Sequence, residues 1–219
     1  MFGVKHMYDT DAIAKAVKSV IDNINNKGQI KIGVSQRHVH LSQEDLETLF
    51  GKGYELHIKK YLMGREYASE EVVTLVGPSL KSIENVRVLG PVRKNTQVEI
   101  SRTDTFVLKV SPPVRPSGNV AGSEKLVLVG PKGCVYLKEG VIIANRHIHL
   151  TPEYAEENGI KDNDYVDVEV EGIKPTRFYD VQVRVRDDFN VEMHIDTDDA
   201  NSAGLKNGSI VKIIGKCEK

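Results

Sequence analysis

An internal repeat constrains the fold of this chain more than any other feature of its sequence. Residues 34–44 read VSQRHVHLSQE and residues 143–153 read IANRHIHLTPE, and the two segments align without a gap. Both contain Arg-His, a branched residue, His-Leu, a hydroxyl residue and a final Glu. A motif that recurs in both halves of a chain predicts two similar structural units.

The sequence around the repeat is typical of β structure. The 219 residues suffice for one large core or for two barrels of roughly 90 to 100 residues each. Beyond residue 28, short runs rich in β-forming residues alternate with Gly, Pro, Asn and Asp. The segment Pro112 to Gly118 is a natural connection between the halves. We therefore expect two β domains.

A second, weaker repeat supports the duplication. Residues 93–100, RKNTQVEI, match residues 186–193, RDDFNVEM. The first repeat has an offset of 109 residues and the second an offset of 93, so the first half contains 16 additional residues between its motifs. An insertion near residues 61–69 would account for the difference.

The repeated His-x-His pairs indicate metal binding. Side chains alternate along a strand, so His38 and His40 project to the same side from backbone positions about 6.6 Å apart. One metal ion can accept ligands across that distance. His147 and His149 repeat the arrangement. A single His-x-His is more often an ordinary polar pair, but its duplication favours a metal site.

Other residues near the motifs have simpler interpretations. Each motif runs into a predicted helix, with Ser42 and Thr151 as N-caps and Pro152 at the first helical position. Arg37 and Arg146 precede the His pairs, and we interpret both as structural anchors to carboxylates or backbone carbonyls.

One further histidine, one glutamate and one arginine complete the set of candidates. His194 can supply a third imidazole ligand to one of the metal sites. Glu99 occupies the strand of the first half that corresponds to the strand of His194. Arg93 lies near a turn, where a guanidinium can bind an oxyanion with two hydrogen bonds or form a surface ion pair. His6 and His57 are interpreted as incidental.

Composition excludes several classes of protein. Lys and Arg total 30 against 31 Asp and Glu, so no basic field exists to hold a nucleic acid. Cys134 and Cys217 form no C-x-x-C pair, which indicates a reducing cytoplasm and two unreactive thiols. Apolar runs such as Val141 to Ala144 fall far short of the roughly 20 residues that cross a bilayer. We expect a soluble, cytoplasmic protein without a membrane segment.

Four motifs together resemble the PduL-type phosphotransacylase family, also called phosphate propanoyltransferase. They are QRHVHLS, GPVRKNTQVEISRTD, NRHIHLTP and VEMHIDTDDANSAG, in this order between Gly33 and Gly204. The resemblance implies a mainly β fold of two β-barrels with short helical caps and an active site between the barrels. It also implies that residues 37–144 form one barrel, and that residues 28–36 and 145–219 form the other.

The resemblance implies an activity and a set of site residues. The reaction would be reversible acyl transfer between coenzyme A and phosphate, with propanoyl or acetyl as the acyl group and propanediol degradation as a setting. Arg93 would bind phosphate, and the residues that contact coenzyme A stay unassigned. Two zinc ions would each be held by three side chains. These are His38, His40 and Glu99 for one ion, and His147, His149 and His194 for the other.

The mechanism follows from what the chain lacks. No Ser or Cys has a recognisable base partner in the sequence, which favours direct attack of phosphate on the thioester over an acyl-enzyme. Three protein ligands leave an open position on each metal, as catalytic zinc requires.

Residues 1–27 contain a predicted amphipathic helix capped by Asp9 or Thr10. Relatives in the family that the chain resembles can carry N-terminal helices that direct them into bacterial microcompartments. The helix can therefore dock on shell or cargo proteins of a microcompartment, or pack as a cap on the first barrel. Its apolar face also leaves a homo-oligomer open.

Three alternative functions are consistent with the residues. A cupin-like metal enzyme is one, because part of the cupin pattern is present at Gly33, His38, His40, Glu44 and Gly51, with one residue missing. Against it, Glu44 and its repeat Glu153 follow helix caps, and the second cupin motif is absent. Another metallohydrolase and a non-catalytic metal-binding module are the remaining alternatives.

Overall fold

The computed structural model describes residues 15, 17–18 and 28–217. The helix predicted within residues 1–27 therefore falls almost wholly outside the described residues, as does His6. Its role as a cap or as a microcompartment signal stays a prediction. Among the described residues, no helix is long and apolar enough to cross a membrane.

Six strands close into a barrel that contains most of the second half of the chain, here called the C-terminal barrel. In spatial order the strands are β1 (Gln29–Ser35), β13 (Glu192–Asp196), β10 (His147–Leu150), β12 (Thr176–Val185), β11 (Tyr165–Val170) and β14 (Ile210–Lys216). Two short helices accompany them. These are α4 (Pro152–Glu157) and α5 (Thr197–Ala203).

The second barrel, here called the N-terminal barrel, closes because β8 pairs with both β4 and β9. Its strands are β4 (Tyr67–Val76), β5 (Ser82–Gly90), β2 (His38–His40), β6 (Gln97–Glu99), β9 (Cys134–Ala144) and β8 (Glu124–Val129). Strands β3 (Ile58–Tyr61) and β7 (Val114–Arg115) extend the sheet, and the helices are α2 (Gln43–Phe50) and α3 (Arg102–Leu108). A mainly β fold with two barrels and short helices is confirmed.

The two barrels have the same topology. Strand β2 is parallel to β5 and antiparallel to β6, as β10 is to β12 and β13. Strand β9 is parallel to β6 and antiparallel to β8, as β1 is to β13 and β14. The duplication predicted from the motifs is therefore present in the strand order and in the strand directions.

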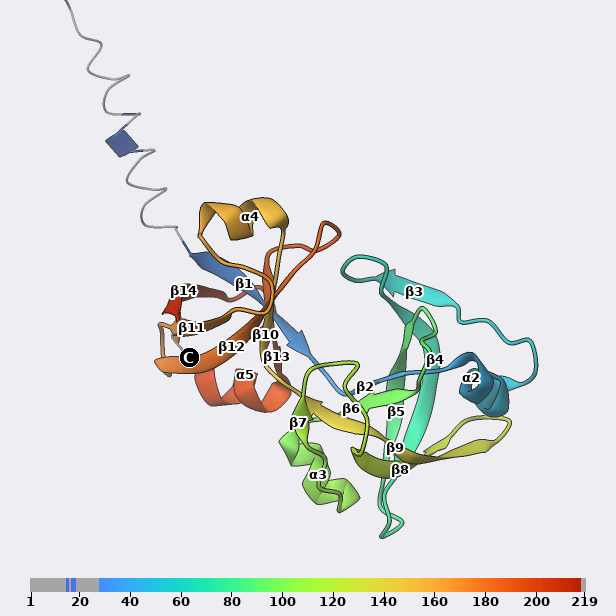
Figure 1. The fold of residues 1–219 in the computed structure, drawn as a ribbon. Helices are drawn as coiled ribbons and strands as arrows, with labels where there is room; N and C mark the ends of the chain where they lie inside the picture. The colour runs from blue at the N-terminus through green and yellow to red at the C-terminus, as the bar shows by residue number, and fades with distance from the viewer. Residues whose placement is uncertain (1–14, 16, 19–27, 218–219) are drawn as a thin grey trace, which may run out of the picture.

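The chain crosses between the barrels directly before each His-x-His strand. Strand β1 precedes β2 in the sequence, but it pairs with β13 and β14 of the C-terminal barrel. Strand β9 precedes β10, but it pairs with β6 and β8 of the N-terminal barrel. Figure 1 shows β1 running beside the strands of the C-terminal barrel before the chain continues into β2. The crossings place both motifs where the barrels meet.

Strand pairing corrects the second sequence repeat. In β2 and β6, His38 lies opposite Glu99, whereas in β10 and β13, His147 lies opposite His194. Glu99 therefore corresponds to His194, two residues beyond the Glu192 of the gapless alignment. Arg93 and Arg186 still correspond, because their N–H groups donate to Leu41 and Leu150. The loop after Arg186 has two more residues than the loop after Arg93, and this shifts the strand that follows.

The additional residues of the first half lie in the predicted region. Strand β3 and its turn into β4 occupy residues 58–67, between α2 and β4. In the C-terminal barrel, α4 is followed directly by β11, the strand that corresponds to β4. The insertion therefore adds an edge hairpin and leaves the barrel order unchanged.

The helix caps agree with the sequence. The Ser42 and Thr151 side chains accept N–H groups in the first turns of α2 and α4, and Pro152 is the first residue of α4. Glu44 and Glu153 lie in these helices, so neither stands on a strand as a cupin ligand would. The cupin alternative is not supported.

Each strand with a His-x-His pair also supplies a residue to a barrel core. Ile148 is fully buried among apolar side chains, between the two histidines of β10, and Val39 has the same place in β2. We expect Ile148→Ala to lower the free energy of unfolding by about 2 to 5 kcal/mol, since it leaves a cavity in a closed core. Denaturant unfolding measures the change, with Ile173→Ala as control because Ile173 is 90% exposed. Equal stability of the two variants would contradict the barrel core.

Candidate metal centres

The predicted ligands gather into two groups of three. In each group the candidate ligand atoms all lie within 4.8 Å of one another. One group is His38, His40 and Glu99, and the other is His147, His149 and His194. Five of these side chains are buried and His194 is half-buried. Strand alternation explains the grouping, because the histidines project away from the barrel core that Val39 and Ile148 enter.

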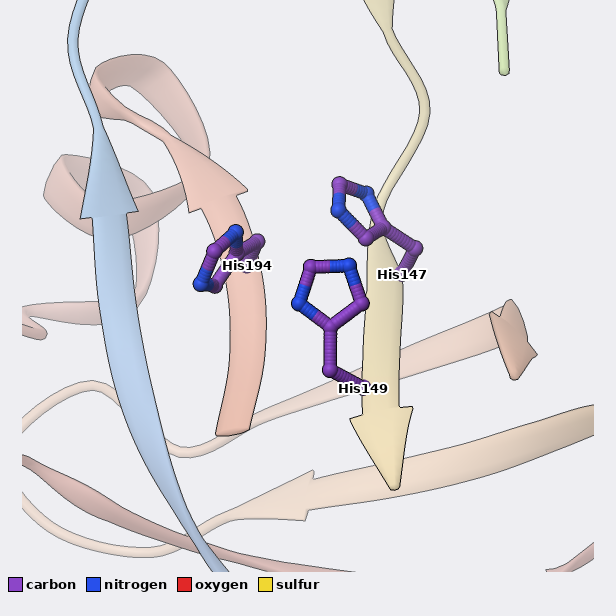
Figure 2. A group of neighbouring side chains, drawn as sticks. All are labelled: His147, His149 and His194. Atoms are coloured by element: carbon purple, nitrogen blue, oxygen red, sulfur yellow. The ribbon is translucent and has the colours of Figure 1, made fainter. Parts of the chain in front are cut away.

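The C-terminal group consists of three imidazoles on neighbouring strands. Figure 2 shows His147 and His149 on β10 and His194 on the neighbouring strand β13, with the three rings close together. The ring centroid of His149 lies 4.8 Å from that of His147 and 4.6 Å from that of His194. His147 and His194 are 5.3 Å apart. This spacing leaves room for a shared ion at the centre.

The N-terminal group replaces one imidazole with a carboxylate. His38 Nε2 lies 3.5 Å from Glu99 Oε2, and the rings of His38 and His40 are 5.0 Å apart. The other carboxylate oxygen, Glu99 Oε1, accepts a hydrogen bond of 2.6 Å from Gln97 Nε2. One oxygen of Glu99 is therefore held by a neighbour while the other faces the histidines.

Hydrogen bonds fix the orientation of the first histidine in each pair. His38 Nδ1 lies 2.8 Å from the Gln36 carbonyl, and His147 Nδ1 lies 2.9 Å from the Asn145 carbonyl. Donation from Nδ1 to a carbonyl leaves the Nε2 lone pair free, which is the usual arrangement of a histidine that binds metal. Both carbonyls belong to the segments that cross between the barrels.

The second histidine in each pair has a buried nitrogen without a partner. Among the described residues, no group hydrogen-bonds to His40 Nδ1 or His149 Nδ1. A buried polar atom that lacks a partner is costly. An ion or water held at the group would compensate for that cost, so both groups fit a bound metal.

Burial keeps the imidazoles of His40, His147 and His149 neutral. It lowers the pKa of His147 to about 4, together with the positive charge of Arg184. Burial lowers the pKa values of His40 and His149 below that of His147. The neighbouring His38 lowers the pKa of His40 in addition, and His147 lowers that of His149. Neutral imidazoles keep the lone pairs that a metal requires, so no proton has to be displaced at pH 7.

The two groups lie close enough to interact. Burial raises the pKa of Glu99, but His38, Ser117, His147 and Arg93 together lower it below its ordinary value. Glu99 is therefore an anion, and it interacts with a histidine of the other group. A cavity between the barrels is lined by Glu99, His147 and His194 and by both crossing segments.

Arg37 and Arg146 pair with carboxylates, as the sequence predicts. Arg37 forms two contacts with Asp104, of 3.0 Å from Nε and 2.8 Å from Nη2. Arg146 Nη1 lies 3.3 Å from Asp199. Both carboxylates belong to the first turn of a helix, α3 or α5. These pairs fasten each crossing segment to a helix and so support the strand that follows.

Arg93 has an acidic partner from the inserted hairpin. Its Nη2 lies 2.5 Å from Glu66 Oε1, and its Nη1 donates to Ser117 Oγ at 3.2 Å. Ser117 Oγ also accepts a hydrogen bond from Gln97, the residue that holds Glu99. Arg93 is thus connected to the N-terminal group, and its guanidinium already binds an oxyanion in the form of a carboxylate.

Several residues near the groups were not predicted from the sequence. Glu66 comes from the inserted hairpin, Arg184 from β12 and Ser117 from the loop after β7. None has a fixed spacing from the motifs, so only the three-dimensional structure identifies them. Residues 112–118 were predicted to connect the two halves, but β7, β8 and β9 all belong to the N-terminal barrel, so this prediction is wrong. His57 lies away from both groups, where its Nδ1 contacts Glu71 at 2.7 Å.

Comparisons with known proteins agree with this geometry. Residues 31–206 match the family model described as phosphate propanoyltransferase. A phosphate propanoyltransferase of Lachnoclostridium phytofermentans is 55% identical over 185 residues, covering 84% of this chain and 87% of the relative. One from Thermotoga maritima is 54% identical over 207 residues, covering 94% and 98%. One from Listeria monocytogenes is 43% identical over 205 residues, covering 91% and 96%.

Proposed function

Because the chain belongs to the phosphate propanoyltransferase family, we propose that it transfers an acyl group between coenzyme A and inorganic phosphate. The observation that carries the proposal is the pair of three-residue groups where the barrels meet, with Arg93 connected to one of them. Propanoyl-CoA and acetyl-CoA are the acyl donors to compare. The proposal leaves the residues that contact coenzyme A unassigned.

We further propose that each group holds one zinc ion. Histidine nitrogen and carboxylate oxygen are the usual ligands of catalytic zinc, and three protein ligands leave a coordination position open. His38, His40 and Glu99 would hold one ion, and His147, His149 and His194 the other. Bound zinc would polarise the thioester carbonyl and stabilise negative charge that develops during transfer.

Arg93 is the proposed phosphate ligand. Its planar guanidinium can donate two parallel hydrogen bonds to a tetrahedral oxyanion and offset part of the charge. In the structure the guanidinium of Arg93 forms an ion pair with the Glu66 carboxylate, and phosphate would have to displace this carboxylate. Ser117 would keep the arginine in place through its contact with Nη1.

The proposed mechanism is direct attack. A phosphate oxygen forms a bond to the thioester carbonyl carbon, the carbon–sulfur bond breaks, and coenzyme A leaves as a thiolate that then takes a proton. Neither cysteine lies on the cavity between the barrels. Cys134 is exposed on β9, and Cys217 Sγ lies 3.0 Å from Asp167 Oδ1. Trapping of a covalent acyl-enzyme would contradict direct attack.

Release of free coenzyme A from propanoyl-CoA by purified protein of known zinc content tests the proposal. We expect release to require phosphate, to stop when a chelator removes zinc, and to resume when zinc is returned. Acyl phosphate should form in equal amount. Release that proceeds equally well without phosphate would instead identify a thioester hydrolase.

A further inference from the structure

Strand β12 places a second guanidinium beside the C-terminal group. Arg184 lies directly opposite His149 in the parallel pairing of β10 and β12. Directly paired residues of neighbouring strands project to the same face of a sheet, so Arg184 projects to the face that carries the metal ligands. The corresponding position in the N-terminal barrel, opposite His40, is Leu89. The arginine is therefore a feature of one barrel and is not part of the duplicated motif.

The surroundings of Arg184 are unusual for an arginine. The side chain is half-buried, and within the part of the chain that the structure describes its guanidinium has no hydrogen bond or ion pair. Burial lowers its pKa and the positive charge of Arg93 lowers it further, whereas the carboxylates of Glu99, Asp162 and Glu66 oppose the change. A half-buried guanidinium usually has a bound anion or a carboxylate to compensate for lost hydration.

Arg93 and Arg184 come from different barrels and lie near enough to repel one another. Each interacts electrostatically with the other and with Glu99. Arg93 belongs to the segment that follows β5 in the N-terminal barrel, and Arg184 to β12 in the C-terminal barrel. Two like charges held near one another are unfavourable unless an anion lies between them. An anion bound by both guanidiniums would relieve this repulsion.

The charge of the two groups also differs. Glu99 contributes a negative ligand to the N-terminal group, while the C-terminal group consists of imidazoles alone. With a divalent ion in each, the C-terminal group would carry one more positive charge. Arg184 adds a further positive charge opposite His149, and the Glu192 carboxylate, which lies 3.3 Å from His194 Nε2, offsets part of the charge at this group.

We propose that Arg184 is a second phosphate-binding residue, which holds the substrate oxyanion together with Arg93. This inference rests on the proposed function, because it specifies how that function's second substrate is recognised. Phosphate would then bridge the two barrels, and one arginine alone would hold it less tightly. Binding through both barrels would fix the orientation of the attacking oxygen relative to the thioester.

Steady-state kinetics of Arg184→Gln and Arg184→Lys test the inference. We expect the glutamine variant to raise KM for phosphate by about 10- to 100-fold, the loss typical of a charge-assisted hydrogen bond. The KM for propanoyl-CoA and the zinc content should stay within about twofold of wild type. The lysine variant should recover part of the loss, because it restores the charge but not the planar fork.

Arg177→Gln is the matched control, since Arg177 lies on the same strand with its guanidinium 5.7 Å from the Tyr179 ring centre. It should leave both KM values unchanged. The inference is overturned if Arg184→Gln leaves KM for phosphate unchanged, or if it raises KM for propanoyl-CoA instead, which would indicate contact with coenzyme A. Lost zinc in that variant would overturn it too, by indicating a structural role.

Calorimetric titration of inorganic phosphate into the zinc-loaded protein separates this inference from the proposed function. If wild type shows no phosphate-dependent turnover, the proposed function fails, yet phosphate binding can still be compared between wild type and Arg184→Gln. Weaker binding by the variant supports the role of Arg184. Equal binding, or no binding by wild type, overturns it.

Discussion

Replacement of His147 by alanine is expected to remove one of the two proposed zinc ions and to reduce phosphate-dependent release of coenzyme A by roughly 1,000-fold. The loss of one ligand out of three should release the ion, and a bound metal contributes several kcal/mol to the stabilisation of developing charge. His147 and Glu99 also line the same cavity and interact electrostatically, so the loss of His147 disturbs both groups. Zinc analysis and measurement of the rate of coenzyme A release, with and without phosphate, on the same preparation check the result.

His57→Ala is the control for this experiment. His57 is a histidine of the N-terminal barrel, its side chain is 68% exposed, and it contacts Glu71 outside both groups. This variant should keep both zinc ions and the full rate. If His147→Ala retains wild-type zinc and turnover, the C-terminal group is not a catalytic metal centre. Denaturant unfolding of both variants shows whether a lower rate follows from misfolding.

The sequence predicts the four motif histidines well because their geometry is local. A strand places residues two apart on the same side, so His38 and His40 can be recognised as a pair without any knowledge of the fold. Duplication then strengthens the prediction. The Ser42 and Thr151 caps are predicted for the same reason, since a cap is a relation between residues three apart.

Relations between distant strands are harder to predict. The gapless repeat aligned Glu99 with Glu192, although strand pairing shows that Glu99 corresponds to His194. The error arose from two additional residues in the loop after Arg186, which change no local pattern. The residue pattern named His194 and Glu99 as candidates, the family resemblance implied their places in the ligand groups, and strand pairing shows that each lies opposite a motif histidine.

The residues that surround the proposed phosphate site were beyond prediction for the same physical reason. Arg184 is significant because β12 pairs with β10, and Glu66 because an inserted hairpin reaches Arg93. Neither relation has a sequence period. The exchange of β1 and β9 between barrels also depends on which sheet edge accepts each strand, and only the family resemblance implied that residues 28–36 join the second barrel.

Arg93→Gln is expected to lower kcat/KM for phosphate by roughly 100-fold, because it removes the charge and the two-pronged donor from the proposed phosphate site. The KM for propanoyl-CoA and the zinc content should change little, since Arg93 belongs to neither ligand group. Varying the phosphate concentration at saturating propanoyl-CoA measures the effect. A variant that loses affinity for both substrates equally would contradict a specific role in phosphate binding.

Glu66→Gln should have the opposite effect and thereby test the same site. Its carboxylate competes with phosphate for Arg93, and a neutral amide would compete less, so KM for phosphate should fall by about 2- to 5-fold, as expected for a partly exposed ion pair. Glu70→Gln is the matched control, because Glu70 lies on the β4 strand of the same hairpin and contacts Lys59 at 3.2 Å. If Glu66→Gln raises KM for phosphate, the carboxylate positions Arg93 and does not compete with the substrate.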